Sequence, residues 1–212
     1  MTTGMMQHDE LLDEYKKIHN GEASFLVNGK KMASSKVFDG SNFNSELGDL
    51  FDHYMRSPTT KKAITLLDYG CGKAAQLHTP GWRGTKLTFH QAYPGRIAAY
   101  WCYDPGYETF DTRPPNIRFD AVVCADVLEH VPEEHAASVV SELFDHCAMK
   151  DGVVFMSISG RPAVKHFAKN GENMHRNQKP LEWWLHLINS KATCKYGLVH
   201  HGLETKTVYR NF

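Results

Sequence analysis

The sequence has no excess of charge of either sign, because 24 Lys and Arg residues balance 24 Asp and Glu residues. Binding to duplex DNA depends largely on neutralising phosphates, so this balance disfavours nucleic acid as a partner and leaves RNA or a local basic patch open. No apolar run approaches the roughly 20 residues that cross a bilayer, so we expect no membrane partner. Residues 1–10 carry neither a charged n-region nor an apolar h-region, so we expect no signal peptide.

Cysteine is also sparse and follows no motif. The five cysteines are scattered and odd in number, which indicates reduced thiols and a cytoplasmic location rather than a disulfide framework. Thirteen histidines are many for 212 residues, but they form no His-Glu-x-x-His pattern, and no Cys-x-x-Cys pair accompanies them. We therefore expect no metal site.

The chain is long enough to bury one good core, and its patterns alternate between strands and helices. Helices are predicted over residues 5–20 and 45–55, from residue 132, and from residue 180. Strands are predicted over residues 64–68, 97–103, 119–124, 153–158, 193–199 and 204–209. This alternation predicts an α/β fold: a Rossmann-like, mostly parallel sheet with helices on both faces, ending in a C-terminal antiparallel hairpin.

Two stretches depart from the alternation. Residues 79–95 are rich in turn signals and are interpreted as an extended first connection. The second and third strands are too close for a helix, another strand and their loops, so one strand–helix unit is missing. Residues 1–45 are predicted to be a helical lid or a packing appendage, and residues 46–212 the Rossmann-like catalytic domain. The polar residues 159–179 are expected to form a long loop over the site.

The most informative motif is a tight turn directly after the first buried strand. Its residues are Asp68, Tyr69, Gly70, Cys71 and Gly72. Glycine lets the backbone turn sharply and approach a ligand, and the helix predicted from Lys73 adds free N–H groups. The carboxylate of Asp68 would repel a pyrophosphate and favour an ammonium group, such as that of S-adenosylmethionine (SAM). A dinucleotide site and a purely structural turn stay open as alternatives.

Three patterns together resemble the class I SAM-dependent methyltransferases. They are the terminal hairpin, the Asp68-x-Gly70-x-Gly72 turn, and residues 119–131, which match an "FDxVxxxxVLEHV" run of that superfamily. The resemblance extends from about residue 45 to the end. Further patterns, including Tyr103-Asp104-Pro105, resemble a small group of bacterial and phage proteins of unassigned substrate. The resemblance implies SAM-dependent methyl transfer but indicates no substrate. We expect a small-molecule acceptor and direct in-line displacement.

Candidate site residues follow three strand ends. The cofactor-binding candidates are Asp68, Tyr69, Gly70, Cys71, Gly72, Lys73, Asp104, Pro105, Tyr107, Asp126, Val127 and Leu128. Asp104 is expected to bind a ribose diol, with an Asp-Pro turn as the alternative, and Tyr107 to stack near adenosine or to pack in the core.

The catalytic candidates are His175, in the polar loop, and His130, nearer the sheet. Either histidine would serve as a base or hydrogen-bond partner for a hydroxyl acceptor. Two other functions stay open: non-methyl-transfer chemistry on SAM, such as a lyase reaction, and a SAM-binding regulatory subunit. The sequence indicates no oligomeric state.

Overall fold

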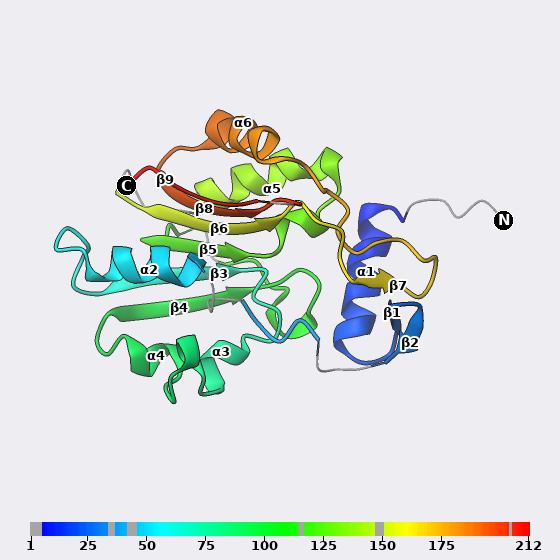
Figure 1. Cartoon of the computed structure of the whole chain (residues 1–212). Coiled ribbons are helices and arrows are strands. Elements are labelled where there is room, and N and C mark those ends of the chain that lie inside the picture. Colours follow the sequence, from blue (N-terminus) through cyan, green and yellow to red (C-terminus); the bar gives the residue numbers. More distant parts are fainter. Residues whose placement is uncertain (1–5, 34–36, 42–45, 115–116, 147–150, 204) are drawn as a thin grey trace.

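The main sheet confirms the predicted α/β fold. The computed structural model describes residues 6–33, 37–41, 46–114, 117–146, 151–203 and 205–212. Six strands lie in the order β4-β3-β5-β6-β8-β9, the first five parallel and β9 antiparallel to β8 (Figure 1). Their bounds are β3 Ile64–Tyr69, β4 Ile97–Tyr103, β5 Ala121–Ala125, β6 Val153–Ser159, β8 Lys195–His201 and β9 Lys206–Arg210. The C-terminal hairpin is therefore present at the edge of the sheet.

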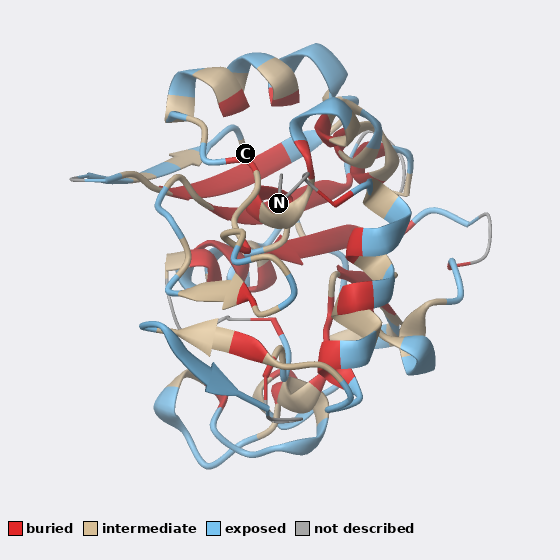
Figure 2. Ribbon diagram, turned by 90° about the vertical axis from the view of Figure 1, so that its right-hand side faces the viewer, coloured by how far each residue is buried: buried red, intermediate tan, exposed pale blue. Residues whose placement is uncertain are grey.

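Helices cover both faces of this sheet, because successive strand side chains point to opposite faces. Leu66 packs on the face covered by α2 (Glu46–Arg56) and α4 (Phe89–Ala92). Leu67 packs on the opposite face, covered by α5 (Glu133–Asp145) and α6 (Leu181–Lys191). The short η1 (Trp82–Gly84) lies within the predicted extended connection. Figure 2 shows buried residues concentrated in the sheet and on the inner sides of the helices.

The predicted absence of one strand–helix unit is also confirmed. Between β4 and β5, the described residues contain only the single turn η2 (Glu108–Phe110). Strand β4 therefore forms one edge of the sheet. Within the described ranges, no helix has the length and apolar character needed to cross a bilayer.

A second, smaller sheet was not predicted. It has the order β2-β1-β7, with β1 (Phe25–Val27), β2 (Lys30–Met32) and β7 (Lys165–Phe167) all antiparallel to their neighbours. Residues 159–179 are thus not the uninterrupted loop expected from their polarity. Three-residue strands are too short to show a clear alternation of apolar and polar residues. In addition, β7 pairs with β1, which is distant in sequence.

Helix α1 (His8–His19) lies against this small sheet, beyond the carboxyl ends of the parallel strands (Figure 1). We call α1, β1, β2 and β7 the cap. Its core includes Leu11, Ile18, Phe25, Phe167 and Met174. The cap therefore combines the N-terminal part of the chain with part of the long polar loop. Of the predicted element ends, residues 5, 45 and 204 lie outside the described residues.

Candidate active site

A cavity of about 600 Å³ lies between the cap and the carboxyl ends of the parallel strands. Its walls come from α1, the glycine turn after β3, the loops after β4 and β5, and residues 159–175. The lining residues include Tyr15, Phe38, Gly70, Gly72, Asp104, Pro105, Gly106, Asp126, Val127, His130, Arg161, Lys165 and His175. Open α/β sheets bind ligands at this end of their strands, and the volume is typical of small-molecule sites.

The glycine turn requires glycine at two positions. Gly70 has φ +75°, and a Cβ there would lie 2.2 Å from Cγ2 of Val127. Gly72 has φ +54°, and a Cβ there would lie 2.1 Å from the carbonyl oxygen of Phe38. The turn is therefore enclosed by the loop after β5 on one side and by residues 38–40 on the other.

The prediction of a free helix N-terminus after this turn is wrong. Helix α3 spans only Ala75–His78, and two backbone N–H groups at its start already have partners within the chain. The N–H of Lys73 donates to the carbonyl of Phe38 (3.1 Å), and that of Ala75 donates to the carbonyl of Asp39 (2.7 Å). Because the chain's own carbonyls satisfy these donors, a ligand would meet the glycines themselves rather than a helix dipole.

Asp68 is fully buried and is not part of the cavity wall. Its Oδ1 accepts a hydrogen bond from Ser41 Oγ at 2.5 Å, and its Oδ2 accepts one from the Tyr100 hydroxyl at 2.6 Å and another from Gln76 Nε2. Burial raises the pKa of this carboxyl to about 6, although the three hydrogen bonds lower it. The geometry therefore gives Asp68 partners within the protein and does not support the predicted contact with a ligand ammonium.

Asp104 links the glycine turn to the loop after β4 at the wall of the cavity. Its Oδ2 accepts the N–H of Gly72 and its Oδ1 accepts the N–H of Gly106, both at 2.8 Å. Burial raises the pKa of this carboxyl. A carboxylate has about four lone-pair positions, so two remain for ligand hydroxyls. Tyr107, by contrast, stacks on His19 with ring centroids 5.1 Å apart and lies outside the cavity wall.

Asp126 has a left-handed backbone (φ +55°) directly after β5, where the loop enters the cavity. Ser157 holds this conformation: its carbonyl accepts the Asp126 N–H at 3.0 Å, and its hydroxyl donates to Asp126 Oδ1 at 2.6 Å. Such strained positions concentrate at functional sites. The next residue, Val127, faces the glycine turn, whereas Leu128 is buried in the main core.

His130 and His175, the two residues predicted as alternative catalytic groups, lie in direct contact in the structure. Their rings meet edge to face with centroids 4.8 Å apart. His130 Nδ1 lies 2.8 Å from the Tyr15 hydroxyl and 3.0 Å from the Met174 carbonyl. Burial lowers the pKa of His130 to about 3 and also lowers that of His175. Both imidazoles are therefore neutral near pH 7.

Eight of the fourteen predicted site residues line the cavity. These are Gly70, Gly72, Asp104, Pro105, Asp126, Val127, His130 and His175. The other six, Asp68, Tyr69, Cys71, Lys73, Tyr107 and Leu128, do not, and their roles in binding stay predictions. Arg161 and Lys165 also line the cavity and belong to the polar residues 159–179 that were expected to lie over the site, whereas Tyr15 was not predicted as a site residue. For Tyr15 a signal existed, since it lies on the apolar face of the predicted first helix.

Residues 43–196 match the family model described as "Methyltransferase domain". The match covers most of the chain, so this protein belongs to that methyltransferase family, whose members generally use SAM. The broader part of the resemblance seen in the sequence is thereby confirmed, without the particular group of bacterial and phage proteins. No curated protein and no solved structure gives a significant match to the chain.

Proposed function

We propose that this protein transfers a methyl group from SAM to a small-molecule acceptor bound in the same cavity. The observation that carries the proposal is the continuity of the cavity wall. The glycine turn and the Asp104 carboxylate in this wall suit an adenosine with its ribose diol. His130, His175 and Arg161 in the same wall offer polar contacts to an acceptor.

SAM supplies a methyl carbon bonded to a sulfonium, which is a good leaving group. The protein's own task is then to orient the acceptor and exclude water. Gly70 and Gly72 allow close approach of the backbone, and Asp104 accepts hydrogen bonds from ligand hydroxyls. We assign the N-terminal segment before α2 the role of a lid, because its residues Tyr15 and Phe38 line the cavity from outside the main sheet.

The two histidines line the cavity side by side. Their neutral rings offer a nitrogen lone pair to an acceptor hydroxyl. The pKa of His130, lowered to about 3 by burial, makes it a weak proton acceptor near pH 7, far from the match that general-base catalysis favours. His175 keeps the role of proton acceptor or hydrogen-bond partner in this proposal, with His130 beside it.

Calorimetric titration tests the proposal directly. The protein should bind SAM or S-adenosylhomocysteine with micromolar or tighter affinity and bind NAD far more weakly. The reverse preference would overturn the methyltransferase assignment. Incubation with SAM and a panel of small hydroxyl and amine compounds should release S-adenosylhomocysteine. Release of methylthioadenosine instead would indicate lyase chemistry on the same ligand.

A further inference from the structure

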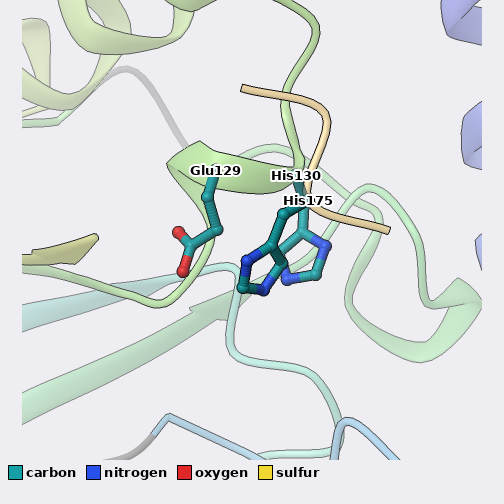
Figure 3. Close-up of side chains that lie close together, drawn as sticks. All are labelled: Glu129, His130 and His175. Carbon is teal, nitrogen blue, oxygen red and sulfur yellow. The ribbon is translucent and has the colours of Figure 1, made fainter. Parts of the chain in front are cut away.

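Three potential metal ligands meet at the wall of the cavity, which His130 and His175 line. A carboxylate oxygen of Glu129 and one ring nitrogen from each of His130 and His175 lie within 4.8 Å of one another. Figure 3 shows the Glu129 carboxylate beside the two imidazoles. Glu129 and His130 belong to η3 (Leu128–His130), directly after β5, and His175 comes from the loop between β7 and α6. The cluster therefore joins two segments that are distant in sequence.

Glu129 is a buried acid whose carboxylate is only half satisfied. It is fully buried, and its Oε1 accepts the Ser159 N–H at 3.0 Å. Its Oε2 is buried with no hydrogen-bond partner, and no cationic side chain among the described residues forms an ion pair with it. An unpaired buried carboxylate is costly, and each such group in a folded protein calls for an explanation. A bound cation supplies the missing partner.

The histidines are held in the orientation that metal ligands adopt. His175 Nδ1 lies 2.6 Å from the Arg161 carbonyl, and His130 Nδ1 lies 3.0 Å from the Met174 carbonyl. A carbonyl oxygen only accepts, so each Nδ1 carries the proton and each Nε2 carries the lone pair. A ring N–H donated to a backbone carbonyl is the usual support of a histidine that binds metal through its other nitrogen.

The loop that carries His175 is fixed against η3. The Asn177 N–H donates to the Glu129 carbonyl at 2.9 Å, on the residue that supplies the carboxylate. The Asn173 side chain accepts the His175 N–H at 2.9 Å and donates to the Ala163 carbonyl at 2.8 Å. These bonds position the third ligand before any ion arrives, which lowers the cost of assembling the site.

We propose that Glu129, His130 and His175 bind one divalent transition-metal ion. Two imidazoles and one carboxylate, without a thiolate, suit Mn²⁺, Fe²⁺ or Zn²⁺. Bonds of about 2.0–2.2 Å place ligand atoms roughly 3–4 Å apart, so the side chains need to close by about one ångström. The remaining coordination positions face the cavity, because His130 and His175 both line it.

The proposed ion also indicates which small molecules would accept the methyl group. This inference rests on the proposed methyltransferase function. A bound metal lowers the pKa of a coordinated hydroxyl, which makes the oxygen a better nucleophile near neutral pH. With the lone pairs of both imidazoles bound to the ion, the hydroxyl proton leaves to water, and the ion takes over the activation that His175 would otherwise provide. The acceptor favoured by this site is a small molecule with a hydroxyl group.

The test is titration of chelator-treated full-length protein with Mn²⁺ in the absence of SAM, followed by calorimetry and by loss of the free Mn²⁺ signal in electron paramagnetic resonance. One ion per chain should bind with micromolar affinity. Glu129→Gln and His175→Ala should each weaken binding at least tenfold. His186→Ala, an exposed histidine on α6, is the matched control and should bind as the wild type does.

Thermal unfolding with and without Mn²⁺ guards against misfolded variants. The wild type should gain stability with added ion, and folded variants should not. Absence of saturable binding, or equal affinity in wild type, Glu129→Gln and His175→Ala, would overturn the metal site. A parallel SAM titration of the wild type separates the two proposals, since failure to bind SAM bears on the methyltransferase function alone.

Discussion

The hydroxyl of Tyr15 lies 2.8 Å from Nδ1 of His130, although 115 positions separate them in sequence. The same hydroxyl lies 3.4 Å from the Met174 carbonyl, which also faces the His130 ring nitrogen. One polar contact thus joins three segments: helix α1 of the cap, η3 after β5, and the loop that carries His175. The cap is thereby connected to the candidate site by a side chain rather than by packing alone.

Replacing Tyr15 with Phe removes this contact and keeps the ring in place. The free energy of unfolding should fall by about 1 kcal/mol, the usual net contribution of one hydrogen bond. Urea unfolding monitored by circular dichroism measures the change. Wild-type stability in Tyr15→Phe would show that the hydroxyl contributes nothing to docking of the cap.

Gly72→Ala tests the close approach between the glycine turn and Phe38. Gly171 is a matched control, because it also has positive φ (+76°) but open space around its Cβ position. Both variants incur a left-handed backbone cost of roughly 1–2 kcal/mol. Gly72→Ala should lose about 1–3 kcal/mol more, because the methyl group overlaps the Phe38 carbonyl. Equal losses in urea unfolding would contradict the observed contact.

Asp104→Ala tests the predicted ribose contact. A hydrogen bond to a charged group contributes about 1.5–3 kcal/mol, so SAM affinity should fall roughly ten- to hundredfold. Asp111→Ala is the control, because Asp111 forms an ion pair with Lys16 at 2.8 Å and does not line the cavity. Its SAM affinity should match that of the wild type. If a folded Asp104→Ala protein binds SAM normally, Asp104 only shapes the turn.

Local patterns were sufficient to predict the main sheet, because its parallel strands carry apolar runs and each long helix has an apolar face. The small sheet escaped prediction, because Phe25 and Phe167 pair across most of the chain and their strands are only three residues long. The polarity of residues 159–179 favoured a long loop and gave no indication of β7. Residues 159–179 are polar because they line a cavity and cross the cap, not because they form an open loop.

Site residues that come directly after a strand could be predicted from the sequence. Contacts between side chains that are distant in sequence could not. Asp104 and Asp126 follow β4 and β5, so topology alone placed them at the cavity. Ligand spacing could not reveal the metal cluster, because His175 lies 45 positions beyond His130 and approaches it only through folding. For Asp68, no sequence signal shows that Ser41, Gln76 and Tyr100 would occupy its carboxylate.

Asp68→Asn should make stability less dependent on pH. Burial raises the folded-state pKa of Asp68 to about 6, whereas its ordinary value is 3.8. Between these values the folded protein holds a proton that the unfolded chain has released, so wild-type stability falls as pH rises from about 4 to 6. The loss attributable to this residue is about 3 kcal/mol once both states are ionised.

The amide that Asp68→Asn introduces does not titrate in this range and can replace the carboxylate locally. Its oxygen can accept from Tyr100 and Gln76, and its NH₂ can donate to the Ser41 hydroxyl. The variant should therefore gain stability relative to wild type as pH rises from 4 to 7, whereas other buried acids affect both proteins alike. Urea unfolding at half-unit pH steps measures the difference. Parallel curves for the two proteins would show that Asp68 is already ionised throughout and that its three hydrogen bonds outweigh burial.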